Sequence, residues 1–255
     1  MIQPQQPSDP EPRGKGRRKT RRTLVVLAAV AAVALIGLAV ASGALAWQRY
    51  WIPAGAMKPT LLVGDYIVVK GHWRYEPAQG EVVVYRHPVN GAVFISRIIG
   101  LPGDRVQMVA GALHLNGARV ETAPAGDFTE IYEPQGPAGG LPRCANAPVA
   151  MGETCLKHLL RETLPGGPSY YVLNIGASFA DDTPVFTVPE GHLFMMGDNR
   201  DNSQDSRFDQ RAGGVGFVPV DNVLGRARFT LFSSAGRSLL FAWTWRRDRF
   251  FKAIE

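Results

Sequence analysis

Hydrophobic and polar positions follow two different patterns along this chain. Residues 23–47 contain no charged side chain, and this run is about as long as the ~20 apolar residues that a helix needs to cross the hydrocarbon core of a membrane. Beyond it, short runs of β-branched and aromatic residues are bounded by Gly, Pro and Asp, which is typical of strands joined by turns. Helical periodicity is absent until near the C-terminus. The pattern therefore predicts one N-terminal helix and a mainly β remainder.

The β-like runs predict strands at 65–70, 81–87, 92–100, 169–175, 183–199 and 215–233. A further stretch at 104–120 predicts two strands joined by a tight hairpin, because Asn116-Gly117 tolerates positive φ at both turn positions.

Composition divides the chain further. The first residues are rich in Pro, Gln and Gly, and residues 121–168 are rich in Pro, Gly and Ala. The expected organisation is a disordered basic tail at 1–22, a transmembrane anchor at 23–47, a β core at 48–120 and 169–235, an inserted loop-rich lobe at 121–168, and a basic aromatic segment at 236–255. For this last segment two readings stay open. Its aromatic and basic residues suit a membrane surface, whereas Leu240, Trp243 and Phe250 also suit packing on the β core.

The net charge of +6 is concentrated at the N-terminus, where residues 1–22 hold seven basic and two acidic side chains. The rest of the chain is close to neutral, so no nucleic-acid-binding face is expected. A basic flank before an apolar run predicts a cytoplasmic N-terminus and an extracytoplasmic main region, with Trp47, Tyr50 and Trp51 at the outer interface. The rival readings are a cleaved signal peptide, given Ala44-Leu45-Ala46, and a twin-arginine signal; the length of the run favours an uncleaved anchor.

Two cysteines, Cys144 and Cys155, lie close in sequence. Outside the cytoplasm such a pair predicts a disulfide. No C-x-x-C motif or close histidine cluster indicates a metal site, and no cofactor is expected.

Four segments, in this order, resemble those of bacterial type I signal peptidases, serine proteases of family S26. The sequence IPAGAMKPTLLVGDYIVVK (52–70) is similar to their nucleophile loop, I-P-S-G-S-M-x-P-T-L followed by G-D. SRIIGLPGDRV (96–106) resembles their general-base segment, K-R-x-x-G-L-P-G-D. GHLFMMGDNRDNSQDSR (191–207) resembles their G-D-N-R-x-N-S-x-D-S-R signature, and GFVPVDNVLGRA (216–227) the segment after it.

The resemblance implies a protease anchored in the bacterial inner membrane, with an all-β catalytic region, that cleaves signal peptides after small residues. In the family, the second serine of S-G-S-M attacks, a buried neutral lysine is the base, and the first serine donates to the oxyanion. Carried over by position, these roles fall on Ala56, Ser96 and Ala54.

None of these three side chains can perform the family's chemistry. Alanine has no lone pair for nucleophilic attack, and an ordinary serine hydroxyl does not accept a proton near neutral pH. Ser96 as nucleophile would need a nearby base, and the lysines nearest in sequence to the nucleophile loop, Lys58 and Lys70, are expected to point to solvent.

Other positions of the family pattern are retained. Ser203 matches the serine that hydrogen-bonds the lysine, and the backbone N–H of Ala56 remains available to an oxyanion. Residues of the signature interpreted as structural scaffolding are Asp198, Asn199, Arg200, Asp205 and Arg207. Residues expected to line the peptide site, unless they are simply core, are Met57, Leu61, Phe94 and Ile95.

Three hypotheses follow from these residues. The first is a catalytically inactive or severely impaired homologue that binds signal peptides or the N-termini of exported proteins, contacts the lipid membrane, or modulates an active paralogue. The second is an active peptidase with a rearranged site, or one whose catalytic residues were replaced by engineering. The third is a structural envelope protein that keeps only the fold.

Overall fold

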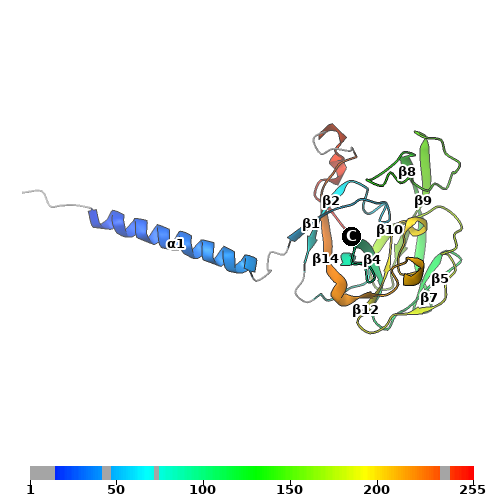
Figure 1. The fold of residues 1–255 in the computed structure, drawn as a ribbon, viewed down its shortest axis with the longest axis horizontal. Helices are drawn as coiled ribbons and strands as arrows, with labels where there is room; N and C mark the ends of the chain where they lie inside the picture. Colours follow the sequence, from blue (N-terminus) through cyan, green and yellow to red (C-terminus); the bar gives the residue numbers. More distant parts are fainter. Residues whose placement is uncertain (1–14, 42–46, 72–74, 236–241) are drawn as a thin grey trace, which may run out of the picture. The chain divides into compact units, whose positions relative to one another are not determined.

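The computed structural model describes residues 15–41, 47–71, 75–235 and 242–255. The chain forms two compact units, Met1–Ala46 and Trp47–Glu255. Figure 1 shows that the α-helix lies in the first unit and that strands dominate the second.

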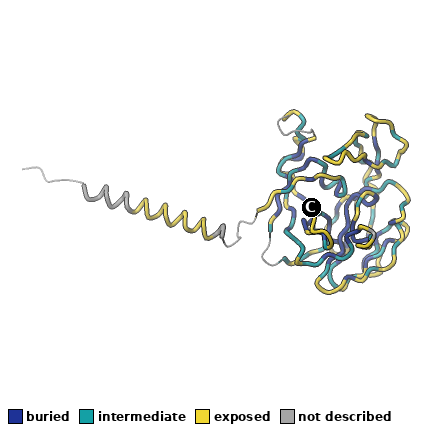
Figure 2. Tube along the Cα trace, in the orientation of Figure 1, coloured by how far each residue is buried: buried dark blue, intermediate teal, exposed yellow. Residues whose placement is uncertain are grey.

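The N-terminal unit contains helix α1, Lys15–Ala41. Residues 15–22, expected to be disordered, are therefore helical, whereas residues 1–14 of the predicted tail lie outside the described part. The described side chains of α1, at 24–38, are exposed (Figure 2). Within the described residues, no helix is long and apolar enough to cross a membrane, so the predicted span at 23–47 is not supported. The motif Ala44-Leu45-Ala46 is not among the described residues.

The second unit is built on an antiparallel eight-stranded sheet. Its strand order is β1-β2-β14-β3-β4-β12-β13, and β15 adds to β14. The strands are β1 Trp47–Trp51, β2 Asp65–Lys70, β3 Val82–Arg86, β4 Val93–Gly100, β12 His192–Met196, β13 Val218–Pro219, β14 Val223–Ser233 and β15 Lys252–Ala253. The β-like runs of the sequence thus correspond closely to β2, β3, β4 and β14.

A four-stranded sheet of order β11-β5-β6-β7 packs with it. Its strands are β5 Arg105–Val109, β6 Ala112–Leu115, β7 Ala118–Arg119 and β11 Phe186–Thr187. The turn between β6 and β7 is Asn116-Gly117, with φ of 56° and 84°. This confirms the predicted hairpin, because both residues adopt the positive φ that such a turn requires.

The third sheet has the order β10-β9-β8, with β8 Glu121–Ile131, β9 Thr154–Thr163 and β10 Ser169–Asn174. Residues 121–168, expected to be loop-rich, therefore hold two long paired strands. The composition misleads because β8 lies at the sheet edge, where proline is tolerated, and its register shifts between Pro124 and Asp127. Cys144 and Cys155 form a disulfide that ties the β8–β9 connection to β9.

Three buried apolar clusters hold the second unit together. One joins the β5–β6 hairpin to β10 and β12, and a second joins the β1–β2 connection to β2, β3 and β14. The C-terminal segment contributes Ile254 to this second cluster, and buried Arg249 pairs with Asp65. Trp243 and Phe250 are exposed, and Leu240 lies outside the described residues.

Short 3-10 helices complete the fold: η1 Arg200–Asn202, η2 Gln210–Ala212, η3 Val220–Asn222, η4 Ala242–Thr244 and η5 Arg247–Arg249.

Candidate active site

The connection between β1 and β2, residues 52–64, forms a closed turn. The N–H of Ile52 donates to the carbonyl of Asp65, and the N–H of Gly64 donates to the carbonyl of Ile52. Met57 and Leu61 bury their side chains in the second apolar cluster, which anchors the connection from beneath. The residues just before Met57 are more open: Ala54 is exposed and Ala56 is partly exposed. The two methyl groups therefore lie where the surface is accessible.

The segment after β12 packs directly on this connection. Asn199 donates from its backbone N–H to the carbonyl of Ala56 and from its amide nitrogen to the carbonyl of Gly55, both at 2.9 Å. Gly197 lies in close contact with both Ala56 and Ser203. A Cβ added at Gly197 would be 2.7 Å from the Ala56 carbonyl oxygen and 2.2 Å from the Ser203 hydroxyl oxygen. The fold thus brings Ser203 beside the connection that carries Ala56, although 147 positions separate them in sequence numbering.

Ser96 lies on β4 and is almost completely buried, with 3% of its surface exposed. Its hydroxyl oxygen is 3.2 Å from the hydroxyl oxygen of Tyr85 on β3. Burial, together with the charge of Asp205, raises the pKa of Tyr85 above its ordinary value, although the hydrogen bond to Ser96 acts in the opposite direction. Neither hydroxyl can therefore serve as a base near neutral pH.

Beside Ser96, Arg97 is fully buried and forms a two-pronged ion pair with Asp198, with both N–O distances at 2.8 Å. Its guanidinium also lies 4.0 Å from the ring centroid of Tyr170 and donates to the carbonyls of Gly80 and Glu255. Asp198 in turn accepts from the hydroxyl of Thr60. This network joins β4, the segment after β12 and the 52–64 connection. Asp198 therefore links three separate segments of the fold.

The other charged residues of the signature form further buried pairs. Arg200 makes two 2.6 Å contacts with Glu162 on β9, and Arg207 makes two 2.9 Å contacts with Asp205. Arg207 also donates to the carbonyl of Arg200 at 2.6 Å. Glu162 was missed by sequence reasoning, because nothing in the sequence near it marks a partner 38 positions away.

Lys58 corrects a sequence expectation. It does not point to solvent but is 3% exposed, and its ammonium group contacts Glu130 and, at 2.6 Å, Gln135. Glu130 also accepts from buried Lys157 at 2.6 Å. Burial lowers the pKa of Lys58, a shift that Glu130 partly opposes. The reason for the error is tertiary, because β8 supplies the carboxylate that makes burial of this lysine tolerable; Lys70 is exposed as expected.

The expected peptide-lining residues divide into two groups. Phe94 and Ile95 on β4 are partly exposed, whereas Met57 and Leu61 are core side chains in this conformation. Among the described residues, no three His, Cys, Asp or Glu side chains are grouped as metal ligands.

Comparisons of the sequence with known proteins show which family the chain belongs to. A sequence model described as "Signal peptidase, peptidase S26" matches residues 22–232. The chain belongs to this family. The proteins named signal peptidase I of Rickettsia typhi and Rickettsia prowazekii are each 31% identical to it over 231 residues, which cover 78% of this chain and 77% of the relative. A crystal structure of a signal peptidase I from Enterococcus faecalis V583 is 24% identical, covers 60% of this chain and 97% of that one, and has a TM-score of 0.31, too low to support any argument.

This member of the signal peptidase family has Ala56 and Ser96 at the two positions where the family resemblance leads us to expect the nucleophile and the base. The 52–64 connection, the Arg97–Asp198 pair and Ser203 are assembled around Ala56. A peptide could still meet the N–H of Ala56, which has no hydrogen-bond acceptor among the described residues. The arrangement offers a donor to a carbonyl oxygen but supplies neither a nucleophile at Ala56 nor a base at Ser96.

Proposed function

We propose that this signal peptidase homologue binds signal peptides, or the N-termini of exported proteins, without cleaving them. One observation carries the proposal: the family's nucleophile position presents a methyl group, Ala56, while its base position presents Ser96, whose buried hydroxyl contacts that of Tyr85. Acyl transfer through a Ser-Lys pair needs both missing groups, and their removal leaves at most the background provided by binding and oxyanion donors.

The alternative of an active, rearranged site has little support in the described contacts. A substitute mechanism would need a serine hydroxyl next to a neutral amine. The two buried lysines, Lys58 and Lys157, both bind Glu130, and neither hydrogen-bonds Ser96 or Ser203 among the described residues. Burial lowers the pKa of Lys58, but its amine contacts Glu130 and Gln135 rather than a serine hydroxyl, so it is not placed to accept a serine proton.

Retained binding is supported by what the substitutions leave in place. The backbone of the 52–64 connection depends on hydrogen bonds from Asn199 and on the buried anchors Met57 and Leu61, none of which involves the lost hydroxyls. Phe94 and Ile95 on β4 remain partly exposed. These features favour a peptide-binding protein over an envelope protein that keeps only the fold.

The test compares cleavage with binding on the full-length protein in detergent. A labelled peptide containing Ala-x-Ala should show no turnover above a buffer control, but should bind with an affinity that weakens when Ala56→Trp fills the site. Turnover that disappears in Ser96→Ala or Ser203→Ala would overturn the proposed inactivity. Absence of binding by a folded protein would instead favour the purely structural alternative.

We further propose that the apolar part of α1 lies in the lipid of the bacterial inner membrane, with the basic flank in the cytoplasm. Support comes from the exposed apolar side chains of residues 24–38 and from the seven basic residues at 1–22. In spheroplasts, added protease should degrade the unit after residue 47 and spare an N-terminal tag. Release of intact protein by alkaline carbonate would contradict lipid insertion.

A further inference from the structure

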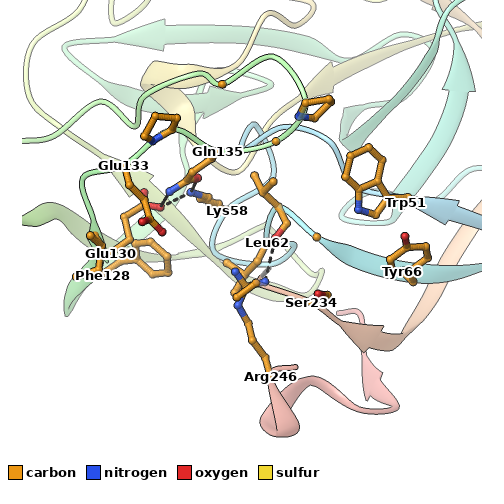
Figure 3. A pocket seen from close by; sticks show the side chains of 18 of the residues that line it. Trp51, Lys58, Leu62, Tyr66, Phe128, Glu130, Glu133, Gln135, Ser234 and Arg246 are labelled. Atoms are coloured by element: carbon orange, nitrogen blue, oxygen red, sulfur yellow. Dashed lines mark hydrogen bonds and ion pairs between the residues drawn. The ribbon is translucent and has the colours of Figure 1, made fainter. Parts of the chain in front are cut away.

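A pocket of about 810 Å³ lies in the second unit, and neither Ala54 nor Ala56 lines it. Figure 3 shows side chains from three separate segments converging on it. One wall comes from residues between Lys58 and Tyr66, another from the end of β8 and the segment that follows, and the third includes Ser234 and Arg246. Nothing in the family chemistry described above uses this space.

The β8 wall has the character of an open sheet edge. Phe128, Thr129, Glu130 and Ile131 all line the pocket, although consecutive strand residues point to opposite faces of a sheet. Four successive lining residues therefore indicate that the backbone itself borders the space. Among the described strands, β8 pairs only with β9, and its outer edge carries no ladder. Unpaired N–H and C=O groups on such an edge are a template for an added strand.

The pocket lining holds two cations and two carboxylates, and one of the two cations forms no salt bridge within the described residues. Glu130 is bound by both Lys58 and Lys157, so its negative charge is already matched. Arg246 donates to the carbonyl of Val63 at 2.9 Å and to the hydroxyl of Ser233 at 2.8 Å, yet it forms no salt bridge within the described residues.

The other charges near the pocket form no salt bridge with Arg246. Glu133 is an exposed carboxylate of the lining, and Asp65, Asp248 and Glu130 act on Arg246 only at longer range. Arg249, which neighbours Arg246, is already paired with Asp65. A guanidinium that is partly removed from water and has no carboxylate partner is stabilised by an anionic ligand, because the ligand accepts charge-assisted hydrogen bonds from it.

Three aromatic side chains, Trp51, Tyr66 and Phe128, complete the lining. Such surfaces suit the side chains of a peptide whose backbone runs along an edge strand. A bare inorganic anion would leave these surfaces and the β8 edge without contacts.

We propose that this pocket binds an extended acidic peptide segment, which adds along the free edge of β8 and places a carboxylate against Arg246. The 52–64 connection lines this site through Lys58 and Leu62 to Gly64, but Ala56 is not part of the lining. Occupancy of this site does not require that signal peptides bind there, so the two proposals succeed or fail independently.

The test uses a dye-labelled seven-residue peptide of alternating Val and Asp, without an Ala-x-Ala motif, and fluorescence anisotropy on the full-length protein in detergent. The expected result is binding at least tenfold tighter than for the matched Val-Asn peptide, because one charge-assisted hydrogen bond accounts for a difference of that size. Methylation of alternate backbone nitrogens in the peptide should abolish binding to the unaltered protein. Arg246→Gln should remove the preference for Asp, whereas the exposed control Arg119→Gln should keep it.

Each arm can overturn the proposal. Equal affinity for the Asp and Asn peptides would show that the carboxylate does not contribute to binding. Unchanged binding of the methylated peptide would contradict the addition of the peptide as a strand along β8. Because Arg246 also braces Val63 and Ser233, the methylated peptide provides a test that does not depend on the folding of a variant. Arg246-dependent binding to phosphatidylglycerol vesicles, with no peptide binding, would assign the site to lipid instead. A peptide site that is unaffected by Ala56→Trp would stand even if the proposed signal-peptide binding failed.

Discussion

The hydroxyl oxygen of Tyr85 lies 3.2 Å from that of Ser96, at the strand position where the family pattern has its lysine base. Val83, two residues before Tyr85, pairs directly with Ser96, so the two hydroxyls are diagonal neighbours across β3 and β4. Because burial raises the pKa of Tyr85, its hydroxyl keeps its proton and remains a neutral donor. The position that the family pattern gives to the base therefore carries a serine in contact with a neutral tyrosine hydroxyl.

This contact predicts how cleavage could be restored. The triple variant Ala54→Ser, Ala56→Ser, Ser96→Lys should cleave an Ala-x-Ala peptide weakly. Adding Tyr85→Phe should raise kcat about tenfold, because the tyrosine hydroxyl no longer donates a hydrogen bond to the lone pair of the lysine nitrogen. Steady-state cleavage of the two variants checks the ratio, and Tyr132→Phe in the triple background is the control. No activity in either variant, with an unchanged circular dichroism spectrum, would show that more than these side chains has been lost.

Removing one member of the Arg97–Asp198 pair should be strongly destabilising. Asp198→Ala leaves the guanidinium of Arg97 buried without its carboxylate, which costs about 3–5 kcal/mol in the free energy of unfolding. Urea unfolding measures this loss, and the exposed control Asp221→Ala should change stability by less than about 0.5 kcal/mol. The double variant Arg97→Met, Asp198→Ala should recover part of the loss. A single variant as stable as the control would refute the bracing role.

Acid should weaken the contact between β8 and the 52–64 connection. Burial opposes ionisation of Glu130, but the charge of Lys58 and hydrogen bonds from Gln135, Lys157 and Lys58 outweigh it and hold the pKa of Glu130 below its ordinary value of 4.5. The unfolded chain then binds the proton more readily, so the stability from this group is full above about pH 4.5 and falls as the pH drops through the lower, folded-state pKa.

The measurement compares the free energy of unfolding at pH 7 and pH 3 in the unaltered protein and in Glu130→Gln. The variant should be less stable at pH 7 and should lose less between the two pH values. Glu76→Gln, at an exposed carboxyl group, should retain the full acid sensitivity. Identical acid sensitivity in Glu130→Gln would show that the contact does not contribute to the pH dependence.

The close packing at Gly197 predicts a steric effect. In Gly197→Ala the new Cβ would meet the carbonyl oxygen of Ala56 and the side chain of Ser203, so we expect a loss of about 1–3 kcal/mol in the free energy of unfolding. Gly140→Ala is the matched control, because a Cβ there meets nothing within 4 Å. Thermal melts of the two variants give the comparison, and equal melting temperatures would contradict the close approach of the two segments.

The sequence by itself determined the mainly β character, several strands and the Asn116-Gly117 hairpin, because alternation and turn chemistry act over a few neighbouring residues. It also determined that Ala56 cannot attack a carbonyl carbon, since no fold gives a methyl group a lone pair. Only the tertiary structure decided that Lys58 is buried and that Ser96 meets Tyr85. The carboxylate that makes burial of Lys58 tolerable comes from Glu130, 72 positions away. Such partners are set by the packing of whole strands and the desolvation of charges, which no local pattern of residues records.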